Sequence, residues 1–141
     1  MIIRIRRKKP ITNAKEVAEI FYRILRAENE FDREKEHFWG VYLNPRNIVK
    51  RIELVHLGTL DTNLCHPREV FRPAIMDPAT QVIICHNHPS GDVDPSNADI
   101  EVTKRLVEAG KILGIGLLDH LIIGREEKDG FFSFKQKGLI K

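Results

Sequence analysis

One segment limits the fold more than any other: an apolar strand that runs into a polar, turn-rich loop and then into a helix. Residues 80–85, TQVIIC, have the apolar centre of a strand that is buried on both faces of a sheet. The loop HNHPSGDVDPSN follows at 86–97. A helix is expected from about Ala98 to Leu113, because Gly114 is placed to end it. This order predicts a central sheet with helices packed on it, which is an α/β fold.

The rest of the chain supplies further strands and helices for such a sheet. Alternating, helically periodic and turn-forming residues predict them in this order: a strand at 3–6, a helix capped by Thr12 or Asn13 and running to about Glu30, strands at 37–44 and 48–58, a helix at 67–77, and strands at 116–124 and 131–134. At 141 residues the chain is long enough for one domain. We expect that domain over 12–141, preceded by a basic arm or strand at 1–11.

The positive charge of the chain lies at its start. The first ten residues hold no acid and five basic side chains, Arg4, Arg6, Arg7, Lys8 and Lys9, whereas the remaining residues carry 18 basic and 20 acidic ones. Such an arm can contact phosphates, or it can be a strand edge whose charges discourage pairing with other chains. We favour the second interpretation, because a nearly neutral body is not typical of a nucleic-acid surface.

Two further features bear on the compartment. No apolar run approaches the ~20 residues that a membrane span needs, and no apolar stretch follows the basic start as in a secretory signal. The two cysteines, Cys65 and Cys85, form no C-x-x-C pair. The sequence therefore predicts a cytoplasmic protein in a reducing environment, without a membrane partner.

His86, His88 and Asp99 have the spacing of a metal site. Residues i and i+2 of an extended chain point the same way, so both imidazoles can converge at the end of the strand. Asp99 starts the next helix, and a strand–loop–helix reversal brings it back over the strand end. Two imidazoles and one carboxylate suit Zn²⁺ and leave a fourth position for water, as in catalytic sites. Zinc lowers the pKa of such a water toward roughly 7.

Two other polar residues are candidates for acid–base and oxyanion roles. Ser96 precedes Asp99 by three residues, so its hydroxyl can point into the same cavity. The pair is also a helix-capping pattern. Glu36 begins the 37–44 strand and can shuttle a proton, although its charged surroundings, DREKE, are typical of a solvated segment.

Asp119 and His120 lie in the apolar string LLDHLIIG. A histidine on such a strand is usually a core residue whose ring is hydrogen-bonded. Metal-bound histidines, however, commonly donate their other ring N–H to a carboxylate, so either residue can support a metal ligand. Cys85, which precedes His86, points to the other face and is expected in the core.

The motif as a whole resembles a known signature. His86-x-His88-Pro89, six residues, Ser96, two residues and Asp99 is similar to the JAMM motif of JAB/MPN-domain metalloproteases. The wider string HNHPSGDVDPSNADI, followed by Thr103 and LLDHLIIG, resembles the RadC family of that superfamily. Supporting matches are Glu36-x-Phe38 with Tyr42-Leu43-Asn44, Gly58-Thr59 and Pro67-Arg68-Glu69-Val70-Phe71. The resemblance covers residues 12–135.

The resemblance implies a single JAB/MPN-like domain with a curved mixed sheet flanked by helices. It implies that His86, His88 and Asp99 bind one zinc ion. It assigns proton transfer to Glu36 and stabilisation of the tetrahedral intermediate to Ser96. Glu34 is a rival acid, because it points the same way as Glu36 if the strand extends that far. The donors alone also suit iron or manganese, so zinc is inferred from the resemblance.

Two functions remain open. The first is a zinc metallohydrolase that cleaves a peptide or isopeptide bond. The second is a non-hydrolytic module that retains the metal site and acts in DNA repair or recombination through partners, a role conventionally attached to the family. Family members usually carry an N-terminal region that resembles helix-hairpin-helix modules. Only about eleven residues precede the first predicted helix here, so any contact with DNA is expected to be weak and indirect.

Overall fold

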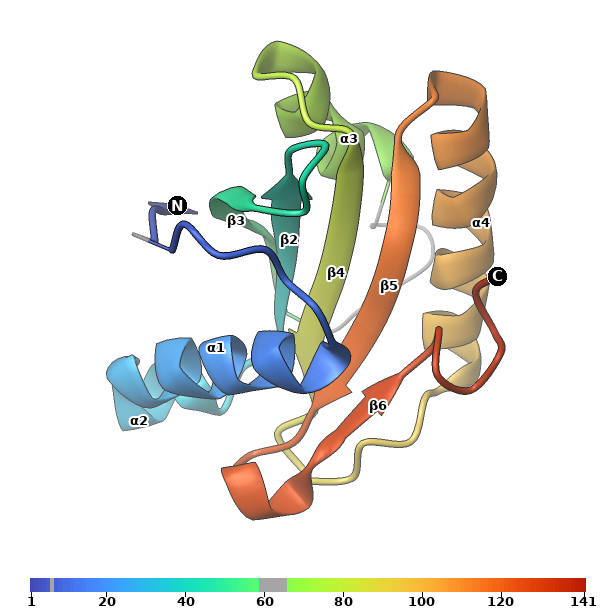
Figure 1. Cartoon of the computed structure of the whole chain (residues 1–141). Helices are drawn as coiled ribbons and strands as arrows, with labels where there is room; N and C mark the ends of the chain where they lie inside the picture. Colours follow the sequence, from blue (N-terminus) through green and yellow to red (C-terminus); the bar gives the residue numbers. More distant parts are fainter. Residues whose placement is uncertain (6, 59–65) are drawn as a thin grey trace.

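The computed structural model describes residues 1–5, 7–58 and 66–141 (Figure 1). The strands are β1 (Ile2–Ile3), β2 (His37–Leu43), β3 (Val49–Leu57), β4 (Gln81–Asn87), β5 (Gly116–Ile123) and β6 (Phe131–Ser133). The helices are α1 (Ala14–Ala27), α2 (Glu30–Arg33), α3 (Pro67–Met76), α4 (Asn97–Leu113) and the short 3-10 turn η1 (Glu127–Asp129). None of these helices is long and apolar enough to cross a membrane.

The strands form one mixed sheet in the order β1-β3-β2-β4-β5-β6. The pair β4 and β5 is parallel and the other neighbours are antiparallel. A parallel pair needs a crossover connection, which α4 provides. One loop, residues 88–96, joins the carboxyl end of β4 to the amino end of α4 (Figure 1).

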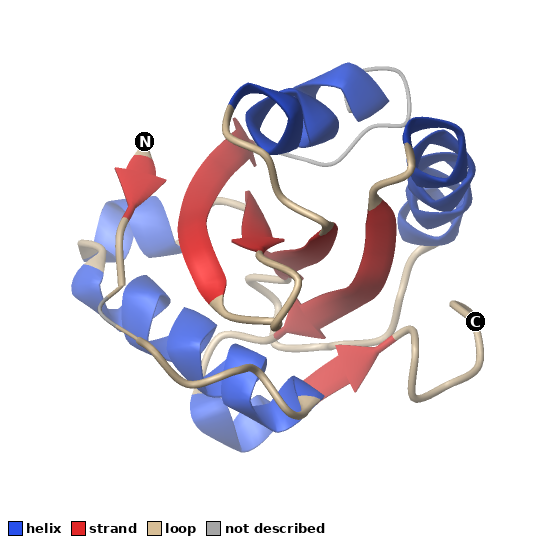
Figure 2. Cartoon of the chain, turned by 45° about the horizontal axis from the view of Figure 1, so that its top comes forward, coloured by secondary structure: helices blue, strands red, loops and turns tan. Residues whose placement is uncertain are grey.

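Helices cover both faces of the sheet, which is open and curved (Figure 2). Successive side chains of β4 point alternately to the two faces of the sheet, as in any β-strand. Val82 and Ile84 belong to the core under α3 and α4, whereas Ile83 and Cys85 belong to the core under α1. The first core is the one that reaches the loop after β4.

Each predicted element has a counterpart among the described residues, with α2 and η1 in addition. The strand predicted at 3–6 is β1 at Ile2–Ile3, and the first helix ends at Ala27 rather than near Glu30. The buried face of α1 differs from the stripe at 17, 20, 21, 24 and 27 that its apolar spacing suggests. Its buried side chains are Val17, Ala18, Phe21, Tyr22 and Leu25. Ile20 and Ile24 are only partly buried, because they face the arm, where Ile5 lies beside them.

Candidate metal centre

The structure brings together His86 at the end of β4, His88 in the following loop and Asp99 in the first turn of α4. Their ligand atoms all lie within 4.8 Å of one another. The Nε2 atoms of His86 and His88 are 3.1 Å apart. Asp99 places Oδ1 3.2 Å from Nε2 of His86 and Oδ2 3.1 Å from Nε2 of His88. Asp99 thus meets both histidines, although it follows His88 by eleven residues in the sequence.

Local structure explains why these side chains converge. His86 is the second-last residue of β4 and pairs with Phe38 of β2 on one side. Asn87 points the other way, where its Oδ1 accepts the backbone N–H of His37 at 2.6 Å. The backbone N–H of His88 donates to the carbonyl of Ile123 at 2.8 Å. The end of β4 is therefore held by both neighbouring strands.

A capping box places Asp99. The backbone N–H of Ser96 donates to Oδ2 of Asp99 at 2.8 Å, and the backbone N–H of Asp99 donates to Oγ of Ser96 at 3.0 Å. These reciprocal bonds satisfy two free N–H groups at the start of α4. Ser96 therefore caps the helix and also lies beside the cluster, with a hydroxyl proton that its role as acceptor does not use.

The charges of the cluster are strongly coupled. Asp99 is 2% exposed. Burial alone raises the pKa of its carboxyl, but hydrogen bonds from His86 and His88 outweigh burial and hold the pKa well below its ordinary value. Burial lowers the pKa of His88, but its hydrogen bond to Asp99 and the nearby carboxylate of Glu36 leave the pKa raised. The cluster therefore favours positive charge next to the Asp99 carboxylate.

The donor set fits a tetrahedral metal ion. Nδ1 of His88 lies 2.7 Å from the carbonyl of Asp92. A carbonyl only accepts, so this nitrogen carries the proton and Nε2 of the neutral ring is a lone-pair donor. Ligands about 2.0–2.1 Å from a tetrahedral zinc ion are about 3.3 Å from one another. The two Nε2 atoms are 3.1 Å apart, and each lies 3.1–3.2 Å from the nearer oxygen of Asp99. His86, His88 and Asp99 can hold such an ion.

The two candidate acids lie in different surroundings. Glu36 is half-buried directly before β2, and its carboxylate is near enough to His88 to raise the pKa of that ring. Glu34 is 58% exposed and pairs with Arg125 at 2.8 Å. The sequence could not separate them because both were assumed to be extended. Glu34 instead follows α2 in a helical conformation, so the geometry favours Glu36.

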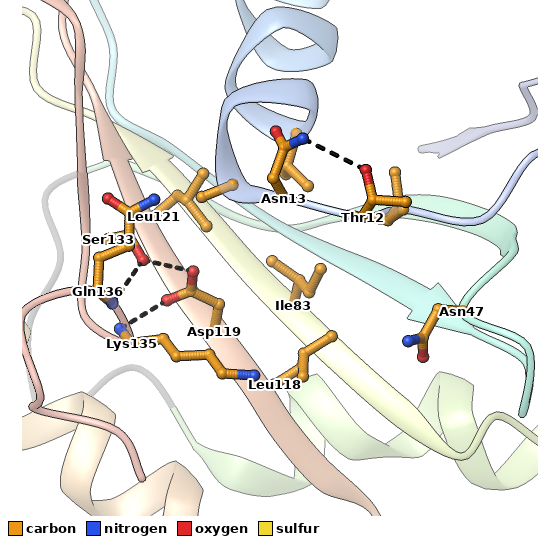
Figure 3. A pocket seen from close by; sticks show the side chains of 13 residues that line it. Thr12, Asn13, Asn47, Ile83, Leu118, Asp119, Leu121, Ser133, Lys135 and Gln136 are labelled. Atoms are coloured by element: carbon orange, nitrogen blue, oxygen red, sulfur yellow. Dashed lines mark hydrogen bonds between the residues drawn. The ribbon is translucent and has the colours of Figure 1, made fainter.

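The structure also separates Asp119 from His120. His120 is fully buried with its Nε2 2.8 Å from Nδ1 of His86, and burial holds the pKa of its ring well below the ordinary value. Asp119 points to the opposite face of β5. There it accepts hydrogen bonds from Oγ of Ser133 at 2.6 Å and from the backbone N–H of Lys135 at 3.0 Å. It lines a cavity of about 380 Å³ beside the start of α1 (Figure 3).

Thr103 is a residue whose role the sequence did not reveal. Its Oγ1 lies 2.6 Å from Nδ1 of His120 and 2.7 Å from the carbonyl of Asp99. A signal was available, since Thr103 follows Asp99 by four residues and so lies on the same face of α4.

The comparisons with known proteins identify a family. The family model described as "RadC-like JAB domain" matches residues 11–139. The chain belongs to this family, as the motif indicated.

The curated relatives that match carry the name UPF0758 protein, and three of them illustrate the similarity. The one from Clostridium acetobutylicum is 47% identical over 131 residues, covering 92% of this chain and 53% of the relative. The one from Methanosarcina mazei is 44% identical over 135 residues, covering 95% and 55%. The one from Caldanaerobacter subterraneus is 56% identical over 105 residues, covering 74% and 43%. The chain thus spans about half the length of the curated relatives it matches.

Proposed function

We propose that the protein is a zinc-dependent hydrolase of peptide or isopeptide bonds. One observation carries the proposal: the ligand atoms of His86, His88 and Asp99 lie within 4.8 Å of one another. His86 and Asp99 are almost fully buried, whereas the side chain of His88 is 15% exposed. Such a site is anchored in the core and reachable from solvent, as a catalytic site must be.

The chain's own residues supply the other functions of a hydrolase. When bound, zinc supplies an activated water and a Lewis acid. The carboxylate of Glu36, next to the cluster, takes the proton of the attacking water and returns it to the leaving amine. The hydroxyl of Ser96 donates a hydrogen bond to the developing oxyanion. Its backbone N–H meanwhile holds the Asp99 carboxylate in place.

Metal content is the first test. The protein is purified without added metal or a histidine tag, beside the Asp99→Ala variant, and both are measured by mass spectrometry. We expect about one zinc ion per wild-type chain and none in the variant. Iron or manganese in its place would change the metal but not the site. A wild-type protein that stays metal-free after zinc addition and dialysis would refute the proposal.

The matched pair Glu36→Gln and Glu34→Gln tests the proton shuttle. Both variants should keep their zinc, since neither residue is a ligand. Removing a general base costs roughly 10²–10⁴-fold in rate, so we expect Glu36→Gln to lose peptide hydrolysis by about that factor. Glu34→Gln breaks only a surface pair with Arg125 and should hydrolyse at the wild-type rate. Zinc binding without hydrolysis by the wild type across peptide and isopeptide libraries would favour the non-hydrolytic module instead.

A further inference from the structure

We propose that His120 and Thr103 are positioning residues that hold the ring of His86 in the one tautomer able to bind a metal through Nε2. The inference rests on the proposed metal site and concerns residues outside the set of ligands. It follows from the direction of three hydrogen bonds, which can be assigned one after another from the chemistry of their partners.

The first bond fixes the hydroxyl of Thr103. Its Oγ1 lies 2.7 Å from the backbone carbonyl of Asp99. A carbonyl oxygen has no proton to give, so the hydroxyl donates its single proton there. Oγ1 must then act as acceptor toward Nδ1 of His120, at 2.6 Å. This nitrogen of His120 therefore carries a proton.

The second step passes from His120 to the ligand. His120 is fully buried, and its ring nitrogens are bonded to Thr103 and His86. Full burial disfavours the charged form of an imidazole, so Nε2 of His120 is bare and accepts. Its neighbour at 2.8 Å is Nδ1 of His86, which must donate. A neutral His86 then has its lone pair on Nε2, the atom nearest Asp99.

The hydrogen bonds and contacts form a closed ring that begins and ends at Asp99. The backbone of Asp99 holds Thr103, which orients His120, which orients His86, whose Nε2 faces the carboxylate of the same Asp99. His88 is held separately by the carbonyl of Asp92. When both ligand rings are neutral, they therefore present lone pairs on Nε2 atoms 3.1 Å apart. Such a pair suits a cation between them.

Aromatic packing keeps His120 in this orientation. Its ring stacks on Phe134 with centroids 4.5 Å apart and an angle of 7° between the planes. Phe38 meets it edge-on at 5.9 Å. Phe134 and Phe38 are themselves buried, so a change of ring orientation would disturb the core. The chain of hydrogen bonds from Thr103 through His120 to His86, called the relay below, is thus buried and sterically held.

Nitrogen NMR of labelled histidines tests the relay without zinc or activity. Long-range proton–nitrogen correlation spectra distinguish the two neutral tautomers. We expect His120 to carry its proton on Nδ1 in the wild type, and to lose this preference in Thr103→Val, which keeps the shape but removes the hydroxyl. Thr103→Ser, which keeps the hydroxyl, should keep the wild-type preference for the proton on Nδ1 of His120. A wild-type His120 protonated on Nε2 would overturn the inference.

Zinc affinity, measured by competition with a chromophoric chelator, supplies the second readout. Residues that orient metal ligands are worth about 10–100-fold in affinity, so we expect a loss of that size in His120→Phe and Thr103→Val and recovery in Thr103→Ser. Ser133→Ala is the matched control. It removes a buried hydrogen bond on the opposite face of β5 and should leave affinity unchanged.

The outcomes separate this inference from the proposed function. A wild-type protein that binds no zinc refutes the metal site, and the NMR result then decides the relay alone. Wild-type zinc binding with unchanged affinity in His120→Phe and Thr103→Val refutes the relay and leaves the metal site standing. Equal losses in Ser133→Ala and Thr103→Val would assign both to general destabilisation and also refute the relay.

Discussion

Asp119 and His120 are adjacent in sequence and serve opposite faces of one strand. The alternation of β5 sends His120 toward α4 and the candidate metal site. It sends Asp119 toward Ser133 and the cavity beside α1 (Figure 3). Both groups are buried, and burial raises the pKa of the Asp119 carboxyl and lowers the pKa of the His120 ring. At the scale of the residue, both side chains could hydrogen-bond to a metal-binding histidine. The face of the strand on which each lies decides that only His120 does so.

The carboxyl of Asp119 should make stability depend on pH. Burial raises its pKa above the ordinary value of 3.8. The folded protein therefore holds this proton more tightly than the unfolded chain, and the associated stability is lost as pH rises from about 4 through the folded pKa. We expect the free energy of unfolding of the wild type, relative to Asp119→Asn, to fall as pH rises from about 4 through the folded pKa. Urea unfolding in the presence of EDTA measures it.

Asp77→Asn is a control of opposite sign. A hydrogen bond from Lys50 lowers the pKa of Asp77. The stability that this carboxylate contributes is present above the ordinary pKa and is lost as pH falls. The wild-type advantage over Asp77→Asn should therefore grow as pH rises toward about 4 and then stay level, whereas the advantage over Asp119→Asn shrinks above about pH 4. Parallel curves for the two variants would show that the carboxyl of Asp119 is not destabilised by burial.

At the scale of the element, the start of α4 combines a structural and a chemical task in Ser96. Its Oγ accepts the backbone N–H of Asp99, and the proposed chemistry uses the same hydroxyl as a donor. Replacing an N-cap serine by alanine costs about 1 kcal/mol, whereas asparagine caps equally well. We expect Ser96→Ala to lose stability and hydrolysis together. Ser96→Asn should keep its unfolding midpoint in urea and still lose hydrolysis; retained hydrolysis in that variant would remove Ser96 from the mechanism.

The other end of α4 depends on a glycine. A Cβ built on Gly110 would lie 2.4 Å from the backbone oxygen of Ile115 and 3.3 Å from Phe71. Alanine is a better helix former by up to about 1 kcal/mol, but the crowded backbone oxygen cannot move aside, and overpacking costs about 1–3 kcal/mol. We expect Gly110→Ala to destabilise the protein by about 1 kcal/mol or more in urea unfolding. Glu108→Ala, on the exposed face, should change stability by less than about 0.5 kcal/mol.

Much at this scale could be predicted from local patterns. The apolar centre of TQVIIC indicated a buried strand, and β4 is indeed the strand that joins the antiparallel part of the sheet to its parallel pair. The spacing of His86 and His88 predicted their shared face. Patterns of this kind act within one element, where period and caps are set by neighbouring residues.

Contacts between elements could not be read in the same way. His86 reaches His120 because β4 and β5 pair in a register that aligns Ile84 with His120 and His86 with Ile122. The two histidines are therefore diagonal neighbours on one face. A shift by one residue would send one of them to the other face. The choice between Glu36 and Glu34 likewise depended on α2, a four-residue helix too short to predict from periodicity.

At the scale of the whole molecule, the cluster joins the two layers that β4 and α4 represent. His86 belongs to the sheet and Asp99 to the helix that covers it. Between the layers, the charged carboxylate and the two rings occupy positions that an apolar core would otherwise fill. A cation bound there links sheet, loop and helix, and is held by the folded protein only, since the ligands separate on unfolding.

Zinc should therefore stabilise the entire fold, by a free energy that grows with the logarithm of the ratio of free zinc to its dissociation constant. Free zinc at one hundred times its dissociation constant adds about 2.7 kcal/mol to the free energy of unfolding. We expect the melting temperature, followed by circular dichroism, to rise with zinc concentration in the wild type and to return to its starting value with EDTA. Asp99→Ala should melt lower even without metal, because the capping box is lost, but its melting temperature should not respond to zinc. An equal zinc response in both proteins would place the binding outside the His86, His88 and Asp99 cluster.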